Sequence, residues 1–186
     1  MADARRSPLA DRLPWLPPDR AVSLTEQRFL RQLELRMHIR GAYLAGLPVP
    51  LEPNRVAAIG GVRTLWLGPD HYLVTAPDGT APELPARLAR AAAGQHASLL
   101  DLSSSRIAIE LSGSRARSLL GKGCGLDLHP RAFAPGQCAQ TLFARAQIIL
   151  DQLDAAPSYR IFVRASFARY LCDWLIDAAG QLRFTS

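Results

Sequence analysis

The chain has little lysine, cysteine or histidine and no long apolar run. Its 22 lysines and arginines include a single lysine, Lys122, and therefore 21 arginines. The three cysteines, Cys124, Cys138 and Cys172, show no CxxC spacing and no zinc-finger histidines, so they are interpreted as structural thiols in a reducing compartment. No segment approaches the roughly 18 apolar residues of a membrane helix, and prolines and charges interrupt the N-terminal region. These absences predict a soluble, cytoplasmic protein with no membrane partner.

The composition fits one folded domain or two small subdomains with a shared core. A chain of 186 residues, 48% hydrophobic and 20% charged, is long enough to fold without disulfides or a structural metal. The net charge is +6, but arginines run from Arg5 to Arg183 with acidic residues between them and never gather into a basic run. This dispersion argues against a nucleic-acid partner, whereas arginine also pairs with acidic protein surfaces.

The first 20 residues are expected to form a proline-rich arm ahead of a domain that spans residues 21–186. The prolines that oppose regular pairing there are Pro8, Pro14, Pro17 and Pro18. Trp15 and Leu16 are large apolar side chains whose exposure to solvent is unfavourable, which suggests that the arm docks on this domain or on a partner. The alternative is a disordered leader. Within the domain, two subdomains are expected to meet near residues 94–98.

Apolar periodicity predicts short strands and helices. Residues 33–40 alternate apolar and polar side chains, which indicates a strand with one buried face and places His38 on its polar face. The other expected elements are a hairpin of 62–67 and 72–76 around Gly68-Pro69-Asp70, a helix at 84–93, strands at 98–101 and 106–111, a helix at 115–120 capped by Ser112 or Ser114, a long hairpin of 141–150 and 159–163, and a helix from a Ser166 cap to Gly180. This order predicts an α+β fold with antiparallel sheets and short packed helices.

The segment Gly121-Lys122-Gly123-Cys124-Gly125 is the most tempting candidate site. Glycines let backbone amides approach an anion, and Lys122 places a positive charge two residues from the Cys124 thiol. A phosphate loop, however, has GxxxxGK[ST] after a strand, whereas these glycines follow a predicted helix that they can simply end. Because no histidine lies close enough in sequence to serve as a base, a structural turn is the stronger interpretation.

Two aspartates and the histidines complete the candidate chemistry. Asp101 and Asp127 each lie between leucines, where a carboxylate can be a general acid or base or, more commonly, an acceptor of backbone hydrogen bonds. The histidines show no HxH, HxxH or HExxH spacing, and GxSxG, GxGxxG and EF-hand patterns are missing. The residues therefore predict no catalytic, cofactor-binding or metal site in this chain.

Short motifs in a fixed order cover nearly the whole chain. They are Leu47-Pro48 with Pro50 and Pro53-Asn54, Leu65-Trp66-Leu67-Gly68-Pro69-Asp70, Asp101-Leu102-Ser103, Leu111-Ser112-Gly113 with Ala116-Arg117 and Leu119-Leu120, Lys122-Gly123-Cys124 with Leu126-Asp127-Leu128-His129-Pro130, Phe133 with Pro135-Gly136, Ala139-Gln140-Thr141, Tyr159 with Val163-Arg164 and Ser166-Phe167, and Leu171 with Trp174-Leu175. Their order and spacing resemble the gamma subunit of heterotetrameric sarcosine oxidase. His71-Tyr72 departs from that family, which more often has an acidic residue followed by Trp.

The resemblance implies a fold akin to the folate-binding domain of aminomethyltransferases and a non-catalytic role in a larger enzyme. That enzyme oxidises sarcosine to glycine with hydrogen peroxide and either formaldehyde or 5,10-methylenetetrahydrofolate. The resemblance implies alpha, beta and delta subunits as partners, and FAD, FMN, NAD and tetrahydrofolate on those other subunits. It gives a structural role to the motif residues Gly68, Pro69, Asp70, Gly113, Ala116, Arg117 and Asp127. The alternative is a stand-alone tetrahydrofolate-binding one-carbon enzyme or assembly factor of the same fold.

Overall fold

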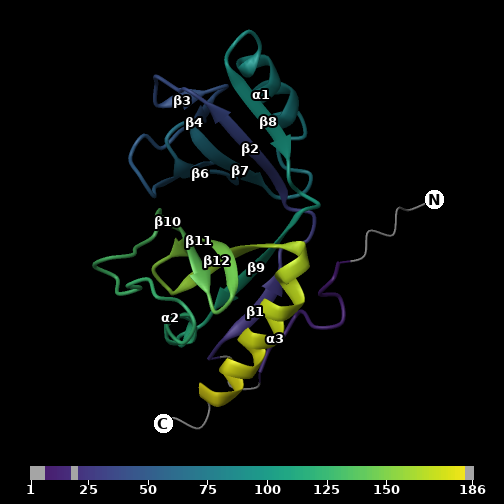
Figure 1. Ribbon diagram of the computed structural model, residues 1–186, viewed down its shortest axis with the longest axis vertical. Coiled ribbons are helices and arrows are strands. Elements are labelled where there is room, and N and C mark those ends of the chain that lie inside the picture. Colours follow the sequence, from purple (N-terminus) through teal and green to yellow (C-terminus); the bar gives the residue numbers. More distant parts are fainter. Residues whose placement is uncertain (1–6, 18–20, 183–186) are drawn as a thin grey trace, which may run out of the picture.

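The computed structural model describes residues 7–17 and 21–182 as two stacked sheets with helices on their outer sides (Figure 1). The strands are β1 (Ser23–Glu26), β2 (Arg31–Met37), β3 (Tyr43–Leu44), β4 (Leu47–Pro48), β5 (Val56–Ile59), β6 (Val62–Gly68), β7 (His71–Ala76), β8 (Ala97–Asp101), β9 (Arg106–Ser112), β10 (Cys138–Phe143), β11 (Ala146–Asp154) and β12 (Ser158–Arg164). The helices are α1 (Leu84–Ala92), α2 (Ala116–Gly121) and α3 (Ala165–Leu182). Both sheets are antiparallel, which confirms the predicted α+β class.

Sheet B has the strand order β5-β6-β7-β2-β8 and contains the predicted hairpin as β6 and β7. Its strand β2 corrects the expectation of a strand with one buried face, because Gln32 and Glu34 are as buried as Leu33 and Leu35. The strand lies between β7 and β8 and has packed layers on both faces, so alternation in sequence did not mean exposure on one side. It also ends at Met37, earlier than expected.

The outer face of sheet B packs on α1 and the small β3-β4 ribbon. Leu84 and Leu88 are four residues apart, so they lie on the same side of α1, and both are buried against the sheet. The buried side chains of this layer are Leu33, Leu35, Met37, Leu47, Val49, Val62, Tyr72, Val74, Ala76, Leu84 and Leu88. Residues 94–98 follow α1 and lead into β8, and the chain crosses to the other sheet after Asp101.

Sheet A has the strand order β1-β9-β12-β11-β10. The long hairpin of β11 and β12 is confirmed, but the predicted continuous segment 141–150 is wrong because a turn divides it into β10 and β11. Ala144 makes that turn at φ 50°, a conformation for which alanine gives no sequence signal. Phe143 pairs with Ala146 across the turn.

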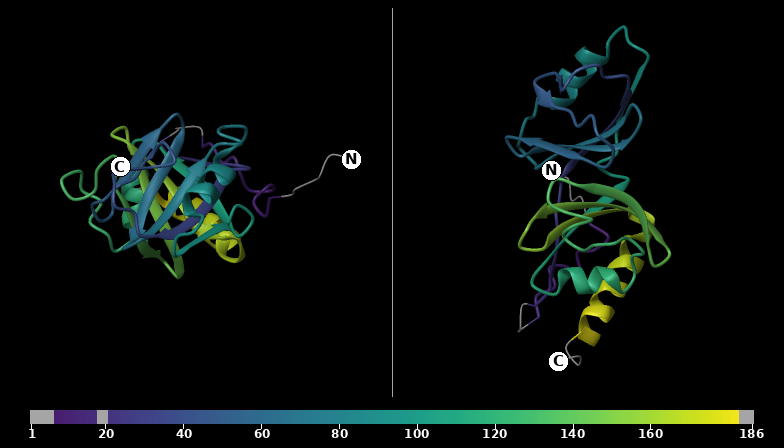
Figure 2. Two further views of the ribbon diagram at one scale, coloured as in Figure 1. Left: turned by 90° about the horizontal axis from the view of Figure 1, so that it is seen from above. Right: turned by 90° about the vertical axis from the view of Figure 1, so that its left-hand side faces the viewer.

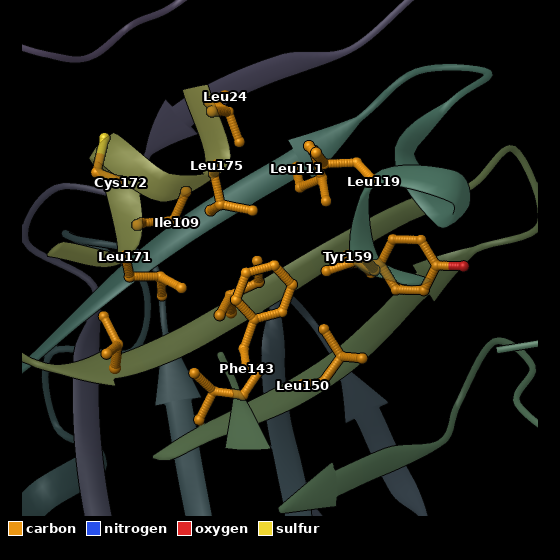
Figure 3. Close-up of a cluster of buried hydrophobic side chains, with 14 of the residues drawn as sticks. Leu24, Ile109, Leu111, Leu119, Phe143, Leu150, Tyr159, Leu171, Cys172 and Leu175 are labelled. Carbon is orange, nitrogen blue, oxygen red and sulfur yellow. The ribbon is translucent and has the colours of Figure 1, made fainter. Parts of the chain in front are cut away.

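Helices α2 and α3 cover the outer face of sheet A, and Figure 3 shows the apolar layer between them and the strands. The predicted serine caps are wrong: Arg115 occupies the N-cap of α2, and Ser166 lies inside α3, which begins at Ala165. Gly180 also lies inside α3 rather than ending it. The helix buries Leu171 and Leu175 on one side, with Ala168, Cys172, Ala178 and Ala179.

Residues 7–17 pack against sheet A rather than extending from it. Leu9 and Leu13 are buried in the layer that α3 and the strands form, and Trp15 pairs through its backbone with Leu24 of β1. The Nε atom of Arg12 donates a hydrogen bond of 2.6 Å to Asp173 of α3. Residues 1–6 and 18–20 of the predicted arm lie outside the described residues.

The two sheets face one another across a third apolar layer (Figure 2). Its buried side chains are Leu30, Leu65, Leu67, Leu73, Ala108, Cys138, Ile149 and Phe162. Among the described residues, no helix is long and apolar enough to cross a membrane. The layers therefore run from α1 through sheet B and sheet A to α2 and α3, with the polar groups of greatest interest between the sheets.

Candidate functional site

A charged cluster lies between the sheets and is centred on Glu34 of β2. This carboxylate is 8% exposed, and its oxygens lie 3.1 Å from Arg36 Nε, 3.3 Å from Arg106 Nη2 and 3.4 Å from His71 Nε2. Odd-numbered residues of β2 enter the outer core, so even-numbered residues such as Glu34 face sheet A. Three basic side chains from β2, β7 and β9 thus converge on a single acid.

The environment of this cluster shifts two pKa values. Burial alone would raise the pKa of Glu34, but the hydrogen bond from Arg36 and the charges of His71 and Arg106 outweigh it, so the pKa is lowered. The pKa of His71 is also lowered, chiefly by burial, which together with the charges of Arg36 and Arg106 outweighs the opposite effect of Glu34. The cluster therefore holds an ionised carboxylate beside a neutral imidazole at neutral pH.

A second polar contact between the sheets is the ion pair of Arg63 and Asp151. Arg63 Nε lies 2.8 Å from Asp151 Oδ2, and Arg63 Nη2 lies 2.6 Å from Oδ1. Two parallel hydrogen bonds of this kind fix both position and orientation. Nearby, Gln140 Nε2 donates a hydrogen bond of 2.6 Å to the Leu67 carbonyl, which also joins sheet A to sheet B. These contacts fasten the sheets and leave no free catalytic group.

The predicted motif Gly68, Pro69 and Asp70 forms the turn of the β6-β7 hairpin. Asp70 adopts φ 56°, and its carbonyl accepts a hydrogen bond of 3.0 Å from the Met37 amide at the end of β2. Its carboxylate lies 3.0 Å from His38 Nδ1, with both side chains exposed. The turn thus ties three strands together at the end of sheet B.

The motif residues Gly113, Ala116 and Arg117 lie where β9 turns into α2. Gly113 has φ 115°, and a Cβ there would come 2.4 Å from the Ala21 carbonyl oxygen, so only glycine fits. Ala116 is fully buried at the start of α2. Arg117 lies beside the Tyr159 hydroxyl, whose pKa burial raises although the arginine opposes that shift. All three therefore serve the packing of this corner.

The remaining candidate aspartates accept local hydrogen bonds. Asp127 Oδ1 accepts one of 2.9 Å from the His129 amide. Asp101 Oδ1 accepts one of 2.9 Å from the Ser103 amide and one of 2.5 Å from its hydroxyl. Both carboxylates thus accept hydrogen bonds from the residue two positions further along the chain.

In the glycine-rich segment, packing requires a glycine at position 123. A Cβ on Gly123 would lie 2.9 Å from the Phe143 ring and 3.0 Å from Trp174. Lys122 Nζ instead donates to Gln181 of α3 at 3.3 Å. Burial raises the pKa of the Cys138 thiol to about 12 and that of Cys172 to about 11, so neither is a thiolate at neutral pH.

The predicted motif residues do not converge on one site. Gly68, Pro69 and Asp70 lie at the end of sheet B, whereas Gly113, Ala116, Arg117 and Asp127 belong to the α2 side of sheet A. Over residues 7–17 and 21–182, no group of three or more His, Cys, Asp or Glu side chains is placed to hold a metal ion. The polar groups between the sheets, Glu34, Arg106, Arg63 and Asp151, were missed by sequence reasoning.

Comparison with known families gives one consistent answer. A model described as the sarcosine oxidase, gamma subunit family matches residues 37–181. Sarcosine oxidase subunit gamma of Corynebacterium sp. (strain U-96) is 36% identical over 170 residues, which cover 88% of this chain and 82% of that one. Its counterpart from Corynebacterium sp. (strain P-1) is 36% identical over 187 aligned residues, covering 95% of this chain and 91% of that one.

Solved structures extend the likeness to the fold. A chain of the heterotetrameric sarcosine oxidase from Corynebacterium sp. U-96, in complex with pyrrole 2-carboxylate, matches with a TM-score of 0.86 and 34% identity over 96% of both chains. The glycine cleavage system aminomethyltransferase T from Bartonella henselae matches with a TM-score of 0.60 and 15% identity over 82% of this chain and 45% of that one. The second match shows a shared fold alone, which confirms the expected relation to aminomethyltransferases.

Proposed function

The chain belongs to the sarcosine oxidase gamma subunit family, and from this premise we propose that it is the non-catalytic gamma subunit of a heterotetrameric sarcosine oxidase. The observation that carries the proposal is the whole-chain match to one chain of such a heterotetramer, at a TM-score of 0.86 over 96% of both chains. A match over both sheets and all three described helices covers the entire folded unit rather than a shared motif.

The proposed enzyme as a whole removes the methyl group of sarcosine by oxidation. Two electrons pass from the N-methyl C–N unit to oxygen, which yields hydrogen peroxide. Water then hydrolyses the resulting imine to formaldehyde and glycine, or tetrahydrofolate takes up the imine carbon and glycine is released. Flavin groups held by other subunits would supply the electron transfer. This chain contributes packing surface, and the charged residues buried between its sheets pair with one another, Glu34 with Arg106 and Asp151 with Arg63.

The interior of this chain does not fit a flavin or a folate. Buried side chains such as Leu65, Ile149 and Phe162 fill the space between the sheets, and two cavities deeper in the described part of the fold measure only about 10 Å³ each. Ligand sites for molecules of that size usually exceed roughly 300 Å³ and enclose most of the ligand, whereas the two larger hollows of the described residues, of about 340 and 310 Å³, are open grooves. We therefore assign FAD, FMN, NAD and tetrahydrofolate to the other subunits.

We assign alpha, beta and delta subunits as partners and the cytoplasm as the location of the complex. The three cysteines support a reducing compartment, because all are free and buried. A basic, arginine-rich chain also suits contacts with acidic faces of larger subunits.

Purification of the tagged chain after co-expression with its neighbouring genes tests the proposal. We expect a yellow complex that consumes oxygen when sarcosine is added, whereas purification without flavin-bearing chains contradicts it. Calorimetry of the isolated chain with tetrahydrofolate tests the alternative function. One-to-one binding there favours a stand-alone folate-binding protein, and no heat of binding supports the subunit role.

A further inference from the structure

The inner face of sheet A extends beyond the part that sheet B covers and forms a groove of about 340 Å³. Its floor includes the buried side chains of Ile149 and Phe162. The polar side chains around it include Arg106, Gln140, Gln147 and Arg164. No carboxylate from the described residues lines this groove, so its charged side chains are both positive, Arg106 and Arg164.

Two arginines of the groove lie directly opposite each other on adjacent strands. Arg106 of β9 pairs in register with Arg164 of β12, and like charges in that position repel. Glu34 lies 3.3 Å from Arg106 and offsets its charge. Within residues 7–17 and 21–182, no carboxylate lies within ion-pair distance of Arg164, whose side chain is exposed. One positive charge is therefore left unbalanced at the groove.

One nitrogen of Arg106 also lacks a hydrogen-bond partner among the described residues. Its Nη1 atom is buried and has no hydrogen-bond acceptor among the described residues. A buried donor without an acceptor destabilises the fold, and such atoms in native proteins usually mark a missing partner. A carboxylate bound between the two guanidinium groups would neutralise the charge of Arg164, and it would reach this buried nitrogen once the Arg106 side chain, which is 22% exposed, turns toward the groove.

Resting on the proposed function, we propose that this groove receives an acidic side chain from another subunit of the complex. Its carboxylate lies between Arg106 and Arg164, and its aliphatic part lies on the apolar floor beside Leu142, which is 56% exposed in the isolated chain. Arginine with exposed apolar area is typical of the centre of protein interfaces. The groove is thus a docking surface selected by charge.

Charge reversal in the co-expressed complex tests this proposal. We expect Arg164→Glu to weaken retention of the flavin-bearing chains at least about tenfold, because it replaces attraction by repulsion. Arg90→Glu is the matched control: it makes the same change in charge at an exposed arginine of α1, which lies on the far side of sheet B (Figure 1). We expect the control to bind as the unaltered chain does.

The outcomes separate this inference from the function on which it rests. If the unaltered chain fails to retain flavin-bearing subunits, the proposed function falls and this inference with it. If the unaltered chain and Arg164→Glu retain them equally, only the docking surface is wrong. Should Arg164→Glu not fold, Arg164→Ala decides the matter, and we expect weaker retention with a smaller dependence on salt.

A free small carboxylate is the rival occupant. Thermal unfolding of the unaltered chain with and without glutarate distinguishes the two sources of the carboxylate. A rise in melting temperature that Arg164→Ala abolishes would mean that the groove binds a small free anion, which overturns the docking surface. An unchanged melting temperature supports the subunit as the source.

Discussion

Arg63 of β6 and Asp151 of β11 form a bidentate ion pair that joins the two sheets. The carboxylate of Asp151 is fully buried, and its two oxygens lie 2.8 and 2.6 Å from Arg63 Nε and Nη2. The side chain of Arg63 is 18% exposed, so it keeps some access to water. Because only Arg63 has access to water, removing Arg63 should destabilise the fold more than removing Asp151.

We expect Arg63→Ala to lower the free energy of unfolding by about 3–5 kcal/mol, because it leaves an unpaired carboxylate in the interior. Asp151→Ala should be less harmful, since Arg63 can turn toward solvent. Denaturant unfolding measures both. The control is Arg12→Ala, which breaks an ion pair of 2.6 Å with Asp173, a side chain that is 55% exposed, and should cost far less than Arg63→Ala because solvent screens this pair. Equal losses in all three variants would contradict the role of burial.

The corner at Gly113 predicts a sharp difference between two glycines. Gly113→Ala should destabilise the chain by more than about 1 kcal/mol, because φ is 115° and the new Cβ would lie 2.4 Å from a backbone oxygen. Gly121→Ala is the control: it lies in α2 with nothing within 4 Å, so it should be neutral or stabilising. Thermal unfolding compares them, and a Gly113→Ala variant as stable as the control would refute the steric argument.

The lowered pKa of His71 predicts a loss of stability in mild acid. The unfolded chain, with an ordinary histidine pKa of 6.5, binds a proton more readily than the fold does. The free energy of unfolding should therefore be highest above about pH 6.5 and fall as the pH drops toward the folded value. The lowered pKa of Glu34 adds a further loss below its ordinary value of 4.5.

Unfolding of His71→Gln between pH 7.5 and about 5 checks this dependence. The variant should show a flatter stability profile than the unaltered chain over that range. His96→Gln, at an exposed position, controls for the loss of an imidazole and should keep the original profile. A steep profile that survives in His71→Gln would assign the effect to another group.

Two buried thiols should resist alkylation in the folded chain. Because burial raises the pKa of Cys138 to about 12 and that of Cys172 to about 11, iodoacetamide at mildly alkaline pH should leave both unmodified until denaturant is added. Peptide mass spectrometry gives the modification at each cysteine. Rapid labelling of Cys138 or Cys172 under native conditions would show that the thiols are accessible.

The sequence predicted the elements whose signals are local. The β6-β7 hairpin follows from Gly68-Pro69-Asp70, α1 follows from its alanines and from Gly94 as a stop, and α3 follows from apolar side chains at helical spacing. The turn at Ala144 was missed because alanine rarely adopts positive φ and carries no turn signal. Ser166 was predicted to cap α3 but lies in its first turn. A serine in the first turn and a serine at the N-cap look alike in sequence, so the sequence could not separate the two positions.

The polar contacts between the sheets could not be predicted from the sequence for a different reason. Glu34 and Arg106 are 72 residues apart, and Arg63 and Asp151 are 88 residues apart, so only the stacking of the sheets brings them together. The alternation around Glu34 indicated a solvent-facing residue, and its burial depends on a second sheet that no local pattern encodes. The resemblance to a family supplied the subunit role that these residues alone did not.

Native mass spectrometry of the complex purified through this chain tests the central claim most directly. We predict a single assembly that contains one copy of this 20.3 kDa chain, three other chains and bound flavin, and that produces hydrogen peroxide from sarcosine. The free chain should form no peroxide under the same conditions. A tagged chain that runs alone, or in an assembly without flavin, would contradict the account.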